Sequence, residues 1–141
     1  MGYYTAYTMR AEGAVNEDVA KQINKALEEK EIIGYALDLG YYFDKEKFIS
    51  WDCADSVKWY SHEEDMLDIS RQFPDVTFLL SGEGENQGDM WDEYFHNGTA
   101  ELCTAEIVFK KPTTIKWPPD HSEPINASGI LDLLKENNDN E

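Results

Sequence analysis

The sequence is short of basic side chains: 12 Lys and Arg stand against 29 Asp and Glu, and the formal net charge is −17. The shortage is greatest between Arg71 and Lys110, where acidic side chains occur without any Lys or Arg. The acidic residues of this stretch are Asp75, Glu83, Glu85, Asp89, Asp92, Glu93, Glu101 and Glu106. Proteins that bind DNA or RNA neutralise backbone phosphates with Lys and Arg. The composition therefore argues against direct nucleic-acid binding.

Cysteines and long apolar runs are also scarce. Cys53 and Cys103 lie too far from other Cys or His residues to form a zinc cluster, and we expect both to be reduced, half-buried packing residues. No apolar run is long enough to span a bilayer, and the N-terminus lacks the basic region and apolar core of a secretion signal. We expect a cytoplasmic protein that does not bind membranes.

Hydrophobic residues are plentiful. Aromatic residues make up 13% of the 141 residues, and hydrophobic residues of all types make up 41%. A chain of this size and composition can bury one core. We expect one domain over residues 1–111 and a tail over 112–141. Pro112, Pro118, Pro119 and Pro124 predict an extended arm, because proline cannot donate to a strand ladder. A short helix at 128–136 could pack back on the domain or contact a second subunit, which would make a homodimer.

Periodicity and turn signals predict two helices among several strands. Asn16 is a good N-cap for a helix that reaches about residue 29. Ser61 and Glu64 form a capping-box pattern for a second helix, which Pro74 ends. Alternating apolar residues and turn residues predict strands at 3–12, 35–43, 47–53, 76–81, 90–96 and 99–109.

This order is β-α-β-β-α-β with an added C-terminal hairpin. The first six elements are typical of a ferredoxin-like α+β fold, in which both helices cover one face of an antiparallel sheet. The pair Asn97-Gly98 predicts the two-residue turn of the added hairpin. The glycine-rich acidic loop 82–88 is the place where a binding surface is most easily built.

No motif indicates catalysis. Residues 83–89 follow part of a calcium loop, but Tyr94 stands where a bidentate carboxylate is needed, so a solvated acidic turn is the simpler interpretation. His62, His96 and His121 have no Ser, Cys or second His at the spacing of a catalytic or metal site. We predict no catalytic residue, no metal ligand and no cofactor, and therefore no enzyme.

The acidic residues are the remaining signal. Carboxylates at i and i+2 of an extended segment, such as Glu83 and Glu85, lie about 6.5–7 Å apart on one side, a spacing comparable to successive phosphates. A second row of negative charge could come from Glu63, Glu64, Asp65 and Asp68. The side chains of Trp59 and Tyr60 could fill apolar subsites in a groove that binds nucleic acid. The alternative is that these charges only solvate the surface. The predicted partner-binding residues are Glu63, Glu64, Asp68, Glu83, Glu85, Asp89, Trp91, Asp92 and Tyr94.

Short motifs within residues 51–109 give a resemblance. Phe73-Pro74-Asp75-Val76, Gly82-Glu83-Gly84-Glu85 and Gly88-Asp89-Met90-Trp91 resemble small ferredoxin-like proteins of the YubB-like type, which are common on phages and plasmids. In size and charge the chain also resembles anti-CRISPR and antirestriction proteins. The resemblance implies a phage or mobile-element protein that acts in the host cytoplasm.

The resulting hypothesis is a nucleic-acid mimic that occupies the basic surface of a nucleic-acid-handling host protein and inhibits it. Two alternatives stay open. One is a domain that binds a divalent metal ion or a small ligand through loop 82–89. The other is a structural protein that forms oligomers through its Pro-rich arm and last helix.

Overall fold

A computed structural model describes residues 3–45 and 47–119 of the chain. The chain divides into two units, Met1–Ile107 and Val108–Glu141, so the division falls four residues before the predicted boundary. Within the second unit, the described residues 108–119 form neither helix nor strand. The predicted helix at 128–136 lies outside the described residues.

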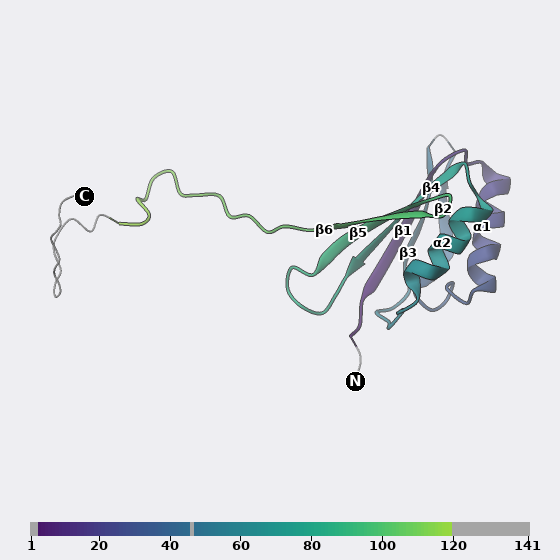
Figure 1. Cartoon of the computed structure of the whole chain (residues 1–141), viewed down its shortest axis with the longest axis horizontal. Coiled ribbons are helices and arrows are strands. Elements are labelled where there is room, and N and C mark those ends of the chain that lie inside the picture. The colour runs from purple at the N-terminus through teal and green to yellow at the C-terminus, as the bar shows by residue number, and fades with distance from the viewer. Residues whose placement is uncertain (1–2, 46, 120–141) are drawn as a thin grey trace. The chain divides into compact units, whose positions relative to one another are not determined.

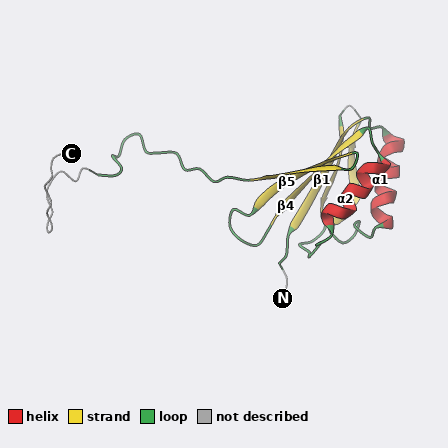
Figure 2. Ribbon diagram, viewed as in Figure 1, coloured by secondary structure: helices red, strands yellow, loops and turns green. Residues whose placement is uncertain are grey.

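The first unit is an α+β structure with a six-stranded antiparallel sheet and two helices (Figures 1 and 2). The strands follow one another across the sheet in the order β2-β3-β1-β4-β5-β6. In chain order the elements are β1 (Ala6–Gly13), α1 (Glu17–Glu29), β2 (Leu37–Asp44), β3 (Phe48–Cys53), α2 (His62–Gln72), β4 (Val76–Glu83), β5 (Met90–His96) and β6 (Thr99–Thr104). Both helices lie on the same side of the sheet.

Helix α1 begins as predicted. The side-chain oxygen of Asn16 accepts a hydrogen bond from the Val19 backbone N–H at 2.8 Å, which satisfies one of the free donors of the first turn. Its apolar residues Ala20, Ile23 and Leu27 are fully buried against the sheet. The Asn16 cap therefore predicted the start of this helix, and the amphipathic pattern predicted the face that it buries.

Helix α2 starts at His62 and ends before Pro74, but the predicted capping box is wrong. The Ser61 side chain makes no capping hydrogen bond. Its hydroxyl instead donates to the Asp65 carboxylate at 3.0 Å, which also accepts from the Trp59 indole N–H at 2.8 Å. Competition from this nearby carboxylate removes Ser61 from the role that its sequence pattern indicates.

The sheet buries one face only. Every second residue of its central strands is buried under the helices, as in β1, where Tyr7, Met9 and Ala11 are at most 3% exposed. The intervening residues, such as Thr8 and Arg10, point to the other side because side chains alternate along a strand. We call that second side the open face. It is the uncovered surface of the sheet.

Two predicted strand limits are wrong by more than two residues. β1 begins at Ala6 rather than at residue 3, because its pairing with β4 starts at the Ala6–Glu83 pair. β6 ends at Thr104 rather than at residue 109, because its partner β5 begins at Met90, whose carbonyl accepts the Ala105 N–H at 2.9 Å. Beyond that point β5 offers no further backbone partner.

The two cysteines differ in exposure. Cys53, on the inner strand β3, is half-buried as predicted. Cys103 is exposed, which contradicts the prediction, because it lies on the edge strand β6, where packing comes from one neighbouring strand only.

Candidate functional site

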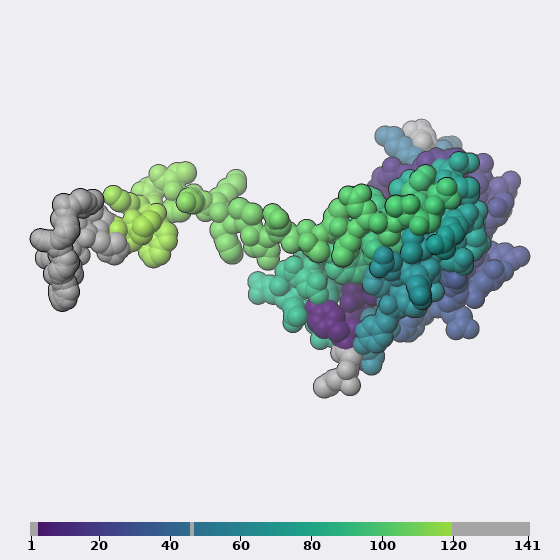
Figure 3. All heavy atoms as spheres, viewed as in Figure 1, coloured from purple at the N-terminus to yellow at the C-terminus, as the bar shows by residue number. Residues whose placement is uncertain are grey.

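The loop between β4 and β5 is fastened to the N-terminal segment. The Tyr3 hydroxyl accepts from the Asn86 backbone N–H at 2.9 Å and donates to the Asp89 carboxylate. The Tyr4 backbone N–H donates to the Glu85 carboxylate at 2.7 Å. In Figure 3 the purple N-terminal atoms lie directly against the green atoms of this loop. These contacts between distant parts of the chain give the acidic loop a defined conformation.

This arrangement changes the spacing expected for the loop acids. β4 ends at Glu83, and residues 84–89 fold back so that the Gly84 N–H donates to the Asp89 carbonyl at 2.8 Å. Glu83 and Glu85 are therefore not successive same-side positions of one strand. The predicted spacing of about 6.5–7 Å for extended i, i+2 pairs does not apply to them.

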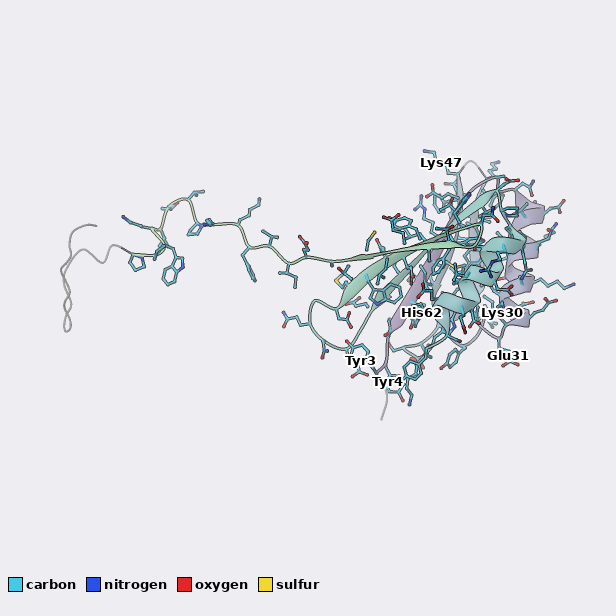
Figure 4. The ribbon with its side chains drawn as sticks, viewed as in Figure 1. Tyr3, Tyr4, Lys30, Glu31, Lys47 and His62 are labelled. Carbon is cyan, nitrogen blue, oxygen red and sulfur yellow. The ribbon has the colours of Figure 1, made fainter. Side chains whose placement is uncertain are left out.

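A pocket opens beside this loop, on the helix side of the sheet, and has a volume of about 390 Å³. Its lining comes from the N-terminal segment, strand β1, the segment before α2, the first turn of α2, the loop, and strands β5 and β6. The lining residues are Tyr3, Thr5, Tyr7, Trp59, Tyr60, His62, Glu63, Asp89, Trp91, Glu93, Leu102 and Thr104. Figure 4 shows Tyr3 and His62, which are far apart in the sequence, at the same end of the sheet. We call it the aromatic pocket.

Aromatic rings build its walls. His62 stacks on Trp91 with ring centroids 5.1 Å apart and an interplanar angle of 24°. Tyr7 meets both Trp59 and Trp91 edge-on, at 5.1 and 5.9 Å. The Trp91 indole lies over Gly82 of the neighbouring strand, where any Cβ would come within 2.2 Å of the ring. A glycine at this position is therefore required for the Trp91 orientation.

A carboxyl–imidazole pair lies in the pocket. The oxygen Oε1 of Glu93 lies 3.5 Å from Nε2 of His62. The other ring nitrogen, Nδ1, lies 3.0 Å from the Trp59 carbonyl. Since a carbonyl only accepts hydrogen bonds, Nδ1 must carry a proton. Nε2 is then the ring nitrogen that faces the Glu93 carboxyl.

Glu93 is an unusual carboxyl because its side chain is only 5% exposed. Burial raises the pKa of this carboxyl, and the negative charge of Glu63 raises the pKa further, whereas His62 acts in the opposite direction. Perturbed carboxyls that line cavities are candidates for functional groups. Neither Glu93 nor His62 was among the predicted site residues.

A second set of acidic residues lies on the open face. Cross-strand registers place six acidic residues there together with the aromatic residues Tyr42, Phe48 and Tyr94. The acidic residues are Glu12, Asp44, Asp52, Glu83, Asp92 and Glu101. Arg10 is the one Lys or Arg at the described strand positions of this face, and its Nε lies 2.6 Å from Glu12. The face is therefore strongly negative.

The predicted partner-binding residues divide among these surfaces. Glu63, Asp89 and Trp91 line the aromatic pocket. Glu83, Asp92 and Tyr94 lie on the open face, where Asp92 accepts a hydrogen bond from the Ser81 hydroxyl at 2.7 Å.

Three predicted residues belong to neither surface. Glu85 accepts the backbone N–H of Tyr4, and Glu64 is exposed in the first turn of α2. Asp68 lies 2.8 Å from the Lys30 ammonium of α1, a contact that lowers the pKa of the Asp68 carboxyl. The structure therefore does not gather all nine residues on one surface.

The described acidic residues also bear on metal binding. Within residues 3–45 and 47–119, no three His, Cys, Asp or Glu side chains come together in a way that could hold a metal ion. Glu85 and Asp89, which a loop-based site would use, accept hydrogen bonds from Tyr4 and Tyr3.

No family model, no curated protein and no solved structure gives a significant match to this chain. Among the helices of the described residues, none is both long and apolar enough to cross a membrane.

Proposed function

We propose that this is a non-enzymatic acidic protein that occupies the nucleic-acid groove of a host defence protein and inhibits it. The proposal places it with inhibitors of the anti-CRISPR or antirestriction type, encoded by a phage or another mobile element and active in the host cytoplasm. The observation that supports it is the open face. At its described strand positions, six carboxylates and three aromatic side chains share one uncovered sheet surface with a single arginine.

Such a surface suits a groove that normally holds a nucleic acid. Carboxylates can replace phosphates at Lys and Arg side chains, and complementary charge accelerates association and selects the partner. Tyr42, Phe48 and Tyr94 can occupy positions where bases stack. The sheet holds these groups in fixed register, so they need not be ordered on binding.

The proposal includes a finer assignment of the fold. We infer that β1 to β4 with α1 and α2 form a ferredoxin-like split β-α-β unit, which β5 and β6 extend at one edge. The order β2-β3-β1-β4 and the placement of both helices on one side support this inference. The short motifs that resemble YubB-like proteins lie in the turn between α2 and β4, at the end of β4, in the loop after it and at the start of β5. They support an origin on a mobile element.

A triple charge reversal tests the proposal. In the test variant, Asp52, Glu83 and Glu101 of the open face become Lys; in the control, Glu17, Glu28 and Glu29 of α1 become Lys. All six residues are exposed, and both variants change the net charge by the same amount. Each protein is immobilised, and partners captured from a bacterial lysate are eluted with increasing salt or with duplex DNA.

We expect the unmodified protein and the α1 variant to retain a nucleic-acid-binding protein that both salt and duplex DNA release. The open-face variant should lose it, with an affinity reduced at least about tenfold for three reversed contacts. Addition of the unmodified protein should then inhibit the nuclease or DNA-binding activity of the purified partner. Equal losses in both variants, or a partner that duplex DNA does not displace, would contradict mimicry.

A further inference from the structure

The aromatic pocket is a separate feature from the open face, because it lies on the helix side of the sheet and is formed by different residues. It is also accessible to a ligand. Two of its lining residues, Tyr60 and Leu102, are 72% and 57% exposed and lie where the pocket meets the surface. A cavity of about 390 Å³ has room for a side chain or a small molecule.

The lining of the pocket attracts positive charge in two ways. Rings of Tyr3, Tyr7, Trp59, Tyr60 and Trp91 contribute to its walls. The face of an aromatic ring is negative and attracts a cation within about 6 Å. The carboxyls of Glu63, Asp89 and Glu93 also line it, whereas no Lys or Arg is among its described lining residues.

The Glu93 carboxyl indicates which polar group a ligand would place in the pocket. Its side chain is almost fully removed from water, and the distance of 3.5 Å to His62 exceeds the 2.7–2.9 Å that is typical of a charge-assisted hydrogen bond. A positively charged N–H donor entering the pocket could therefore make a shorter contact with this carboxyl than His62 does. His62, Glu63 and Asp89 are the other ionisable groups beside it, with the hydroxyls of Tyr3, Tyr7 and Tyr60.

The geometry points to a binding site for one organic cation of the guanidinium or ammonium class, with its head group beside Glu93 and its alkyl chain between aromatic rings. Arginine and lysine side chains of a protein and free alkyl cations share this chemistry. The cation takes the position beside the carboxylate that His62 holds in the free protein. This site does not depend on the proposed function, since it requires nothing of the open face.

Matched ligands test the inference on the full-length protein. The cationic probes are the peptide Gly-Arg-Gly, with blocked ends, and agmatine, a free alkylguanidinium. The control peptide carries citrulline, which has the shape of arginine without its charge. Binding is followed by tryptophan fluorescence, since Trp59 and Trp91 line the pocket, and by calorimetry.

We expect saturable binding of a cationic probe with a Kd of about 0.1–1 mM, and at least about tenfold weaker binding of the citrulline peptide. Tighter binding of the arginine peptide than of agmatine would assign the site to a protein side chain, and the reverse order to a free cation. Equal binding of the arginine and citrulline peptides, or no saturation by either cation, would overturn the inference.

Two variants locate the site. Glu93→Gln removes the buried charge and keeps the shape, and should weaken cation binding at least about tenfold, whereas Glu64→Gln should change it less than about twofold. Glu64 carries the same charge at the same end of the molecule but does not line the pocket. Equal weakening by both variants would show only general electrostatic attraction and would overturn the inference.

Leu102→Arg provides an independent variant in case Glu93→Gln does not fold. Leu102 is exposed and lies directly opposite Glu93 in the β5–β6 register. The guanidinium that this substitution introduces should occupy the pocket and prevent binding of the added cation. Unchanged binding of the probes to a folded Leu102→Arg protein would contradict the site.

Discussion

Glu93 shows how much depends on a single residue and its direction. Its neighbours along β5, Asp92 and Tyr94, point to the open face, whereas Glu93 points under the helices and is buried. A carboxyl in that position weakens the fold when it is ionised, because burial and the nearby Glu63 both oppose its charge. Ionisation of Glu93 therefore has a cost in stability.

Glu93→Gln should stabilise the protein at pH 8. The pKa of Glu93 is raised in the folded state above its ordinary value of 4.5. The contribution of this carboxyl to the stability of the fold is therefore complete below pH 4.5 and is lost as the pH rises through the folded pKa. Each unit of elevation corresponds to about 1.4 kcal/mol. The gain in Tm, measured by circular dichroism, should thus be largest at pH 8 and should disappear near pH 4.

An exposed carboxyl serves as the control for this measurement. Glu101→Gln, on β6 and on the open face, should change Tm little at either pH, because the Glu101 side chain is solvated in the folded and unfolded states. If Glu93→Gln lowers Tm at pH 8, or raises it equally at pH 8 and pH 4, the burial of an ionised Glu93 is not what limits stability there.

The β4–β5 loop supplies Asp89 to the pocket and contacts the Tyr3 side chain that also lines it. It is held by its own backbone hydrogen bonds and by two residues that precede the first strand. The Tyr3 hydroxyl bonds to two points of the loop, at Asn86 and at Asp89, and the contact with Asp89 raises the pKa of the Tyr3 phenol. A change in Tyr3 should therefore act locally.

Tyr3→Phe should loosen the loop while leaving the fold intact. The variant loses the acceptor of the Asn86 N–H, and a hydrogen bond contributes about 1 kcal/mol net, so amide exchange at Asn86 should become about fivefold faster. Tyr4→Phe is the control, because Tyr4 contacts Glu85 through its backbone. Equal acceleration in both variants would contradict a specific role for the Tyr3 hydroxyl.

The helices and strands were largely predictable because their signals are local. The Asn16 cap and the spacing of Ala20, Ile23 and Leu27 indicate α1 by themselves, and Asn97 and Gly98 adopt positive φ angles of 45° and 83° at the turn before β6. The limits of β1 and β6 were not predictable in the same way, because a strand ends where its partner ends.

The pocket could not be predicted because its residues meet only after folding. Tyr3, His62 and Trp91 come from three distant segments, and each alone has an ordinary explanation in the sequence. One signal was available: if β5 is a strand, Asp92 and Glu93 must point to opposite faces, so one of two adjacent acids must face the core. Following that alternation would have identified Glu93 as a buried carboxyl.

At the scale of the whole molecule, the net charge of −17 works against the fold. Like charges repel one another more strongly in the compact state than in the unfolded chain. The repulsion extends over about 30 Å at 0.01 M salt and over about 10 Å at 0.1 M. A protein selected only for stability would gain from fewer acidic side chains, which is consistent with a role for the charge in attracting a cationic partner.

Salt should therefore stabilise the free protein. Raising NaCl from about 0.01 M to about 0.3 M at pH 8 should increase Tm, because screening shortens the range of the repulsion among carboxylates. The control is the same titration near the isoelectric point of about 4.3, where the net charge vanishes and the increase should be absent. An equal increase at both pH values would show a general solvent effect of the salt. In that case self-repulsion would not limit the stability of this chain, and its acidity would carry no measurable cost that a binding function has to offset.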